Sequence, residues 1–184
     1  KTPMLPVMKN AITFFEKIKK KKISKLVIFD PTSPLRSMED IQNAIKNFNK
    51  EKPDLLLSVH KAQHNPYFSM VEKKGKYFKL CKNPEKNPGT RQLVPLVYEI
   101  NTIVWIYSRK AIFLENRRIP KKTLIFKTPI KRSIDIDTND DIDRIYYYLN
   151  DQNKEYLVNY SYNKFHIIKQ MINKLLIFDL SNDI

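Results

Sequence analysis

Short runs of β-branched and aromatic residues alternate along the chain with longer amphipathic segments, and this alternation limits the folds available. Residues 5–20 carry apolar side chains at helical spacing, and residues 25–29 form a strand-sized run that stops at Asp30-Pro31. Further strand-sized runs lie at residues 55–59, 103–107 and 123–127, and further helices are predicted after Ser37 and from about Thr138. Strands alternating with helices predict an α/β fold, a mostly parallel sheet covered on both faces.

Local signals refine this arrangement. Ser37 followed by Asp40 predicts a helix N-cap with an acidic residue in the first turn. The turn signal at Gly75 lies between apolar runs at residues 67–71 and 76–80 and predicts a β-hairpin. Residues 82–90 hold two prolines and a glycine and predict a loop.

The cysteine content and the hydropathy of the chain indicate its cellular location. The single cysteine, Cys81, excludes an intramolecular disulfide framework and indicates a reducing, cytoplasmic location. No apolar run approaches the ~20 residues that a membrane-spanning helix needs, so no membrane partner is expected.

The net charge of +15 raises the alternative of a basic nucleic-acid-binding module. The excess is mostly lysine and is spread along the chain, apart from one dense run at residues 17–22. We therefore favour a solvated lysine-rich face over nucleic-acid binding.

The stretch from Ser133 to Thr138 carries the strongest chemical signal. Read as a strand, it points Asp135 and Asp137 the same way and buries Ile134 and Ile136. Two neighbouring carboxylates suit Mg²⁺, which takes one or two carboxylates together with substrate phosphates. The alternative is a solvent-facing strand end in which Asp137 or Thr138 caps the next helix.

Two further stretches are candidates for ligand binding. Residues 30–36 follow a predicted buried strand at its carboxyl end, where ligands bind in open α/β sheets. The alternative is a proline-stiffened turn that caps its helix. Arg91-Gln92, with Tyr98 and Asn101 following, precedes the strand at residues 103–107, and arginine suits carboxylate recognition.

Together these stretches resemble the acylneuraminate cytidylyltransferases, the CMP-sialic acid synthetases. The resemblance rests on Pro31-Thr32-Ser33-Pro34-Leu35-Arg36, on Arg91-Gln92 with Asn101, and on Ser133-Ile134-Asp135-Ile136-Asp137, in this order and spacing over about residues 1–150. It implies a Rossmann-like nucleotidyltransferase domain, a three-layer sandwich. The implied reaction forms a CMP-sugar from CTP and an acidic nine-carbon sugar and releases pyrophosphate, with Mg²⁺ as cofactor.

The resemblance also implies roles for individual residues. Asp135 and Asp137 would hold the metal and, with Arg91 facing the sugar carboxylate, would be the catalytic residues. The substrate-binding residues would be Asp30, Ser33, Arg36, Arg91, Gln92, Asn101 and Trp105. It further implies a homodimer in which the region from Arg91 to Tyr107 reaches a neighbour.

Three residues depart from the family pattern. Asp30 stands where the family commonly has Gln; it could accept hydrogen bonds from the sugar or supply a third metal carboxylate, but it cannot donate. Thr102 replaces a Gly, and Trp105 replaces a Tyr. The Asp30 variant resembles a bacterial branch that acts on legionaminic-type sugars.

The two ends of the chain give further expectations. The family's glycine-rich phosphate loop has no counterpart here, and the chain has only two glycines, so the sheet is expected to lack its first βα units. Activity is then expected of a longer parent and not of this segment alone; the alternative is an inactive remnant of the fold. Residues 151–173 are expected to be a linker. Residues 174–184 resemble the first strand of a haloacid-dehalogenase-like domain, in which Asp179 is expected to be an inert strand end.

Overall fold

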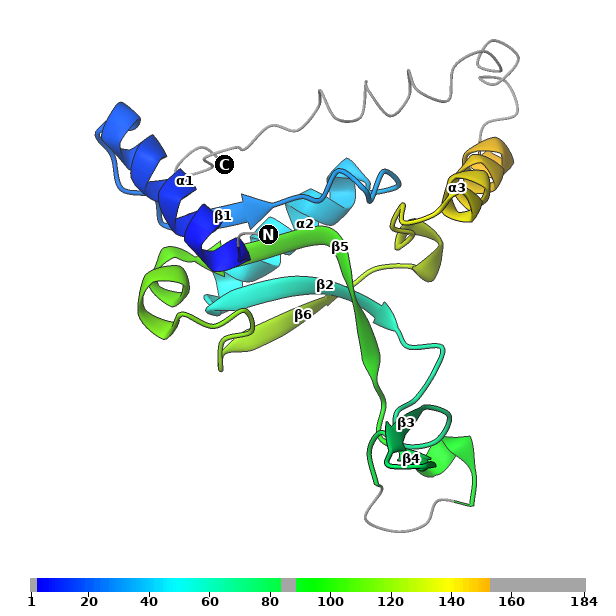
Figure 1. Cartoon of the computed structure of the whole chain (residues 1–184). Coiled ribbons are helices and arrows are strands. Elements are labelled where there is room, and N and C mark those ends of the chain that lie inside the picture. The colour runs from blue at the N-terminus through cyan, green and yellow to red at the C-terminus, as the bar shows by residue number, and fades with distance from the viewer. Residues whose placement is uncertain (1–2, 84–88, 153–184) are drawn as a thin grey trace.

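The main sheet has four strands in the order β1-β5-β2-β6 (Figure 1). The computed structural model describes residues 3–83 and 89–152. The strands are β1 (Lys25–Ile28), β2 (Leu55–Lys61), β5 (Tyr98–Ser108) and β6 (Thr123–Lys127). β1 and β2 both pair antiparallel with β5, and β2 pairs parallel with β6.

The predicted α/β class is confirmed, and the mostly parallel sheet is confirmed in part. The sheet is mixed: β1, β2 and β6 run in one direction and β5 runs against them, so that both ladders of β5 are antiparallel. The cause is the connection that precedes β5. The chain leaves β2 at its carboxyl end and returns to the sheet at β5, and the described residues of this connection, 62–83 and 89–97, contain no α-helix. A neighbouring parallel strand needs a crossover, whereas a chain that turns back at the same edge pairs antiparallel.

Helices cover both faces of this sheet. α1 (Met4–Lys19) packs on one face and α2 (Met38–Glu51) on the other, which gives three layers (Figure 1). α2 begins at the predicted cap, a capping box in which Ser37 and Asp40 each bond the other's backbone N–H. α3 (Asn139–Gln152) follows the sheet.

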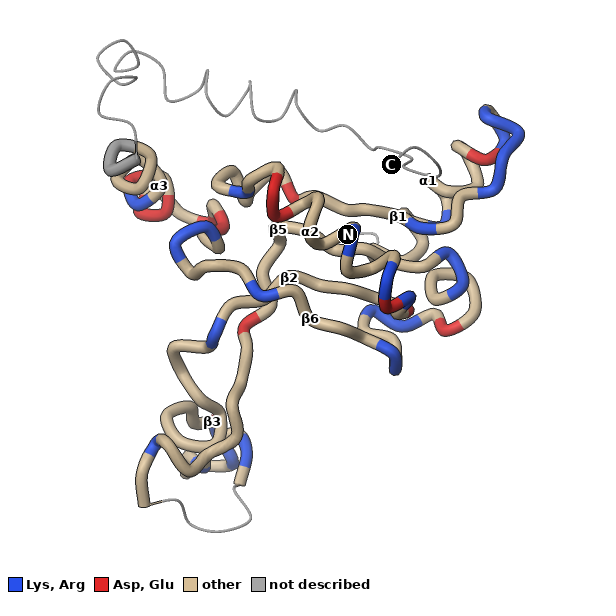
Figure 2. The backbone as a smooth tube through the Cα atoms, turned by 180° about the vertical axis from the view of Figure 1, so that it is seen from behind, with Lys and Arg blue, Asp and Glu red and all other residues tan. Residues whose placement is uncertain are grey.

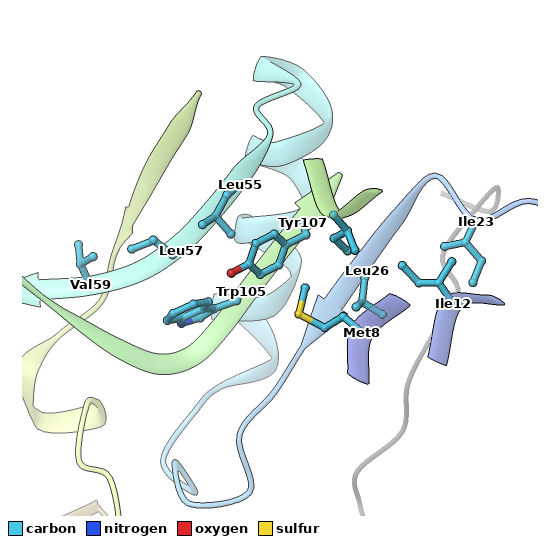
Figure 3. Close-up of a cluster of buried hydrophobic side chains, with 10 residues drawn as sticks. Met8, Ile12, Ile23, Leu26, Leu55, Leu57, Val59, Trp105 and Tyr107 are labelled. Atoms are coloured by element: carbon cyan, nitrogen blue, oxygen red, sulfur yellow. The ribbon is translucent and has the colours of Figure 1, made fainter. Parts of the chain in front are cut away.

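The alternation of side chains along the strands divides the core into two clusters. Figure 3 shows the cluster beneath α1, where Met8 and Ile12 of the helix meet side chains of three strands. Its buried members are Met8, Ile12, Ile23, Leu26, Leu55, Leu57, Val59, Trp105, Tyr107 and Ile112. The cluster beneath α2 contains Val27, Ala44, Phe48, Leu56, Ile103, Val104 and Ile106.

An arm, of which residues 62–83 and 89–97 are described, projects away from the sheet (Figure 1). It contains the hairpin of β3 (Val71–Lys74) and β4 (Tyr77–Leu80) and the 3₁₀ turn η1 (Arg91–Leu93). The predicted hairpin is confirmed, but its first strand begins at Val71, where the predicted strand at residues 67–71 ends. Gly75 lies between the two strands with φ +67°, the left-handed conformation that glycine adopts without steric cost.

The predicted strand around Asp135 is not found. β6 ends at Lys127, the 3₁₀ turn η3 (Ile130–Arg132) follows, and residues 133–136 then run without a ladder partner in the described sheets. The turn carries the chain off the sheet edge, although Ile134 is still buried as predicted. A π-helical turn, η2 (Ala111–Glu115), was also not predicted. The expectations for residues 153–184 lie outside the described residues.

The pairing register of β5 shifts where this strand passes β2, and the extra residues form a bulge. Leu57 pairs with Trp105 but Val59 pairs with Ile100, so the single residue Ser58 faces residues 101–104. The Ser58 hydroxyl, which is fully buried, accepts from Val104 N–H at 3.0 Å and donates to the Asn101 carbonyl at 3.3 Å. The Ser58 side chain thus provides hydrogen-bond partners for two backbone groups of the bulge, Val104 N–H and the Asn101 carbonyl.

We predict that Ser58→Ala lowers the free energy of unfolding by about 1–3 kcal/mol, because Val104 N–H loses its acceptor in a buried place. Urea unfolding of the purified chain measures this. The control is Ser24→Ala at an exposed serine, which should change stability little. Equal effects of the two substitutions would show that Ser58 does not hold the bulge.

Candidate functional site

Three segments meet where β1 ends, beside the bulge of β5. The loop of residues 30–37 follows β1, residues 101–104 form the bulge, and residues 133–137 follow β6 through η3. Ile136 N–H donates to the Thr32 carbonyl at 2.9 Å and ties the first loop to the last segment. The structure therefore brings together two of the three predicted stretches at one edge of the sheet, the edge at which open α/β folds bind ligands.

A chain of hydroxyl groups leads to Asp135. Thr102 Oγ1 lies 3.1 Å from Asp135 Oδ2 and is also hydrogen-bonded to Ser33 Oγ. Ser33 is buried, with 1% of its surface exposed. Its hydroxyl therefore points into the structure and bonds Thr102, and its predicted contact with a substrate stays a prediction.

The other carboxylate oxygen of Asp135 has no partner. Asp135 Oδ1 is buried and accepts no hydrogen bond from the described part of the chain. A buried acceptor without a donor is unfavourable by itself, so such an atom in a cluster of this kind calls for a ligand. Asp137 lies two residues further along, with its side chain exposed.

Thr138 confirms the capping alternative for this stretch. Its hydroxyl accepts from Asp141 N–H at 3.4 Å, and Asp141 Oδ2 accepts from Thr138 N–H at 2.9 Å, which starts α3. Hydrogen bonds from Thr138 hold the pKa of Asp141 below its usual value. Asp137 contributes its backbone N–H to this cap, which leaves its carboxylate free of the capping role.

Arg36 closes the loop after β1 on itself. Its guanidinium donates to the carbonyls of Asp30 and of Ser33, the latter at 3.0 Å, and stacks over the Phe29 ring at 5.4 Å. Burial lowers the pKa of this guanidinium, while the carboxylates of Asp30 and Asp135 act in the opposite direction. Arg36 thus places positive charge near Asp135 while it holds the loop's shape.

Asp30 also serves the loop. Its Oδ1 accepts from Thr32 N–H at 3.2 Å and from the Thr32 hydroxyl at 2.8 Å. Within residues 3–83 and 89–152, no group of three or more His, Cys, Asp or Glu side chains is placed to hold a metal ion. The alternative that Asp30 supplies a third metal carboxylate stays a prediction.

An ion pair fixes the segment that carries Asp135. Arg132 donates to both carboxylate oxygens of Asp40, at 3.0 and 2.7 Å. Burial opposes ionisation of Asp40, but hydrogen bonds from Arg132 and Ser37 outweigh it, so its pKa lies below the usual value. Because Asp40 also caps α2, this pair joins η3 to the start of that helix.

Asn101 and Trp105 are turned into the structure. The side-chain amide of Asn101 donates to Thr128 Oγ1 at 2.9 Å and to Ser133 Oγ at 3.0 Å. The backbone carbonyl of Asn101 accepts from Trp105 Nε1 at 2.7 Å. Both residues are buried, and Trp105 packs in the cluster beneath α1. Here they brace the bulge and the segment before Asp135; their predicted contact with a sugar stays a prediction.

The third predicted stretch is divided between two places: Asn101 lies in the bulge at the site, whereas Arg91 and Gln92 lie elsewhere. Arg91 and Gln92 form part of η1 on the arm, which points away from the sheet (Figure 1). Both side chains are exposed, and Arg91 donates to the Gln63 carbonyl within the arm. The described chain does not by itself bring them to Asp135.

Charge is distributed unevenly around this site. Figure 2 shows the lysine run at the end of α1 on one side of the molecule, whereas the acidic residues at the start of α3 lie on the other. The site thus lies apart from the strongest basic patch. In the part of the chain that is described, no helix is long and apolar enough to cross a membrane.

Sequence reasoning missed several residues that shape the site, namely Ser58, Thr128, Arg132, Ser133 and the function of Thr102. Arg132 offered a weak signal, since a basic residue next to an acidic stretch often pairs. The others are ordinary strand or loop hydroxyls, and only the bulge gives them their partners.

No family model matches the chain. It is similar to a protein named post-translational flagellin modification protein B from Campylobacter coli, with 29% identity over 149 residues, which are 81% of this chain and 63% of that protein. It is also similar to a CMP-N,N'-diacetyllegionaminic acid synthase from Campylobacter jejuni subsp. jejuni serotype O:2, with 30% identity over 138 residues, which are 75% of this chain and 58% of that protein. The similarities support the cytidylyltransferase-like family that the motifs indicated, and the chain spans less than two thirds of both relatives.

We predict that Arg132→Gln lowers the free energy of unfolding near pH 7 by about 2 kcal/mol, because it leaves the buried Asp40 without its cation. In the unchanged chain, the depressed pKa of Asp40 gives stability that is present above the unfolded value of about 3.9 and lost as pH falls through the native pKa. In the variant, that stability is missing already at neutral pH.

Denaturant unfolding across pH 2.5–7 measures both effects. The control is Arg144→Gln, which breaks an exposed pair with Asp141 and should cost little. The same pH profile in all three proteins would contradict the role given to the Arg132–Asp40 pair.

Proposed function

We propose that the chain is the sugar-facing part of an enzyme that transfers CMP from CTP to a sialic-acid-like nine-carbon acid, with release of pyrophosphate. The observation that carries the proposal is Asp135, held at Oδ2 by Thr102 while Oδ1 stays buried and unpartnered at the ligand-binding edge of an α/β sheet. Similarity to a CMP-N,N'-diacetyllegionaminic acid synthase supports it. The reaction would take place in the cytoplasm.

The proposed cofactor is Mg²⁺, held by Asp135 and Asp137. The donor set fits, because Mg²⁺ prefers carboxylate oxygens, needs only one or two from the protein, and takes the rest from phosphates and water. When bound, the ion would neutralise charge on the CTP phosphates and so favour displacement at the α-phosphate. The buried Oδ1 of Asp135 is the strongest single reason for this assignment.

The residues around Asp135 would position the substrates. Arg36 keeps the loop after β1 closed and adds positive charge near the carboxylates, where an anionic nucleotide would bind. Asp30 bonds Thr32 through Oδ1, and Oδ2 would accept hydrogen bonds from the sugar. A carboxylate there favours a sugar with additional N–H donors, and we propose a legionaminic-type acid with two acetamido groups.

The arm would complete the site through a second copy of the chain. The arm exposes several large apolar side chains, and an exposed apolar surface of this kind marks an interface with another protein. They are Phe68, Met70, Val71, Tyr77, Phe78, Leu93 and Leu96. Burial of this surface in a homodimer would bring Arg91 of one copy towards the carboxylates of the other, where it would bind the sugar carboxylate.

We predict that Asp135→Asn lowers pyrophosphate release at least about a hundredfold, since it removes a charged metal ligand. The assay supplies CTP and Mg²⁺ with either N,N'-diacetyllegionaminic or N-acetylneuraminic acid, to the whole gene product that contains this chain and to the 184-residue chain. Asp140→Asn, at an exposed position in α3, is the control and should retain activity.

Faster turnover with the legionaminic acid would support the assigned substrate. No pyrophosphate from the whole gene product with either sugar would contradict the proposed function and favour an inactive remnant of the fold. Salt-sensitive binding of DNA that Asp135→Asn leaves unchanged would favour the nucleic-acid alternative.

We predict that Leu93→Asp weakens self-association by at least about tenfold, because a carboxylate would be buried in the proposed interface. Leu93 is 74% exposed in the single chain. Leu114, on η2 beside the sheet, is 72% exposed and provides the matched control, Leu114→Asp. Sedimentation velocity over a concentration series measures both. Dimers weakened equally by the two substitutions, or monomers throughout, would contradict an interface on the arm.

A further inference from the structure

We propose that Thr102 is a positioning residue for Asp135: its hydroxyl holds Oδ2 and thereby turns Oδ1 towards the cation. This inference rests on the proposed function, since it assigns one oxygen of one proposed ligand to the metal. Thr102 itself would touch neither the metal nor the substrates.

The direction of the hydrogen bonds follows from counting hydrogens. A threonine hydroxyl has one hydrogen, and an ionised carboxylate only accepts. Thr102 therefore donates to Asp135 Oδ2, and Ser33 donates to Thr102. The Ser33 hydrogen is thus already used, and the two hydroxyls form a directed chain that ends at the carboxylate. Each bond in such a chain polarises the next, which strengthens the last one.

The backbone holds both hydroxyls in place independently of Asp135. The Thr102 carbonyl accepts from Asp30 N–H at 3.4 Å, and Ser33 N–H donates to the Asp30 carbonyl at 3.3 Å. Thr102 belongs to the bulge that Ser58 supports on both sides. The donor is therefore fixed before the carboxylate is oriented, as positioning requires.

The chemistry of Asp135 leaves a cation as the fitting partner for Oδ1. The guanidinium of Arg36 interacts electrostatically with Asp135, but it donates through Nε and Nη2 to the Ser33 and Asp30 carbonyls and gives no hydrogen bond to Asp135 Oδ1. A buried carboxylate oxygen with no donor is costly, and a divalent ion would remove that cost. A side chain that orients a metal ligand commonly contributes about 10- to 100-fold to metal affinity.

The test compares Thr102→Val, which keeps the shape and removes the hydroxyl, with Thr102→Ser, which keeps the hydroxyl. The matched control is Thr123→Val: Thr123 is also a half-buried strand threonine whose hydroxyl is bonded, to the Pro120 carbonyl at 2.7 Å, but on β6. Mn²⁺ binding to the 184-residue chain is measured by electron paramagnetic resonance. Three-bond NMR couplings report the side-chain rotamer of Asp135 without metal, and Asp135→Asn defines the site.

We expect Thr102→Val to weaken Mn²⁺ binding about tenfold and to average the Asp135 rotamer, while Thr102→Ser and Thr123→Val stay near the unchanged chain. If Asp135→Asn abolishes Mn²⁺ binding but Thr102→Val binds normally with a single rotamer, the positioning role is overturned and the metal site stands. If Asp135→Asn leaves Mn²⁺ binding unchanged, the proposed metal site fails, and the role assigned to Oδ1 fails with it.

Discussion

Two hydrogen bonds from the buried hydroxyl of Ser58 hold β5 in a path that an ordinary strand could not take. Opposite this one residue the strand accommodates residues 101–104, and the extra length turns Asn101 and Thr102 towards the segments that follow β1 and β6. Without the bulge, side chains would alternate regularly between the two faces, and no hydroxyl would reach Asp135. The polar site is thus a product of a backbone irregularity that a core residue stabilises.

The site is then fixed from two further directions. Arg132 pairs with Asp40 at the start of α2, and Ile136 N–H bonds the Thr32 carbonyl, so the Asp135 segment is tied to the loop and helix after β1. These contacts join parts of the sequence about a hundred residues apart. They make the position of Asp135 depend on the packing of the whole sheet, which suits a group that must meet a ligand with defined geometry.

The sequence predicted the elements whose signals are local. Helix periodicity, the Ser37 cap and the turn at Gly75 each depend on a few neighbouring residues, and all three were confirmed. The direction of β5 was not predictable in this way, since it depends on how the arm returns to the sheet. Residues 133–137 alternate like a strand, yet η3 takes them off the sheet edge, and alternation alone contains no information on a pairing partner.

For the site, Asp135 and the loop at residues 30–36 were identified from the sequence. The contact of Thr102 with Asp135 was not, because it depends on the bulge. The predicted contact of Arg91 with a substrate beside Asp135 could not be checked in the same way, because a single chain holds Arg91 on the arm, away from the carboxylates.

The strand order also determines when this sheet can assemble. Each ladder of the main sheet joins strands that are not consecutive in the chain, and among the described strands only β3 and β4 form a local pair. Such topologies fold slowly, because long loops must close before the contacts stabilise them. When the chain is synthesised, β1 and β2 emerge from the ribosome before the arm, and β5 emerges after it. Until β5 is available, neither β1 nor β2 has a neighbouring strand in this sheet. During that interval their edges are open to pairing with other chains, and prompt folding of the arm would shorten the exposure by shortening the effective loop.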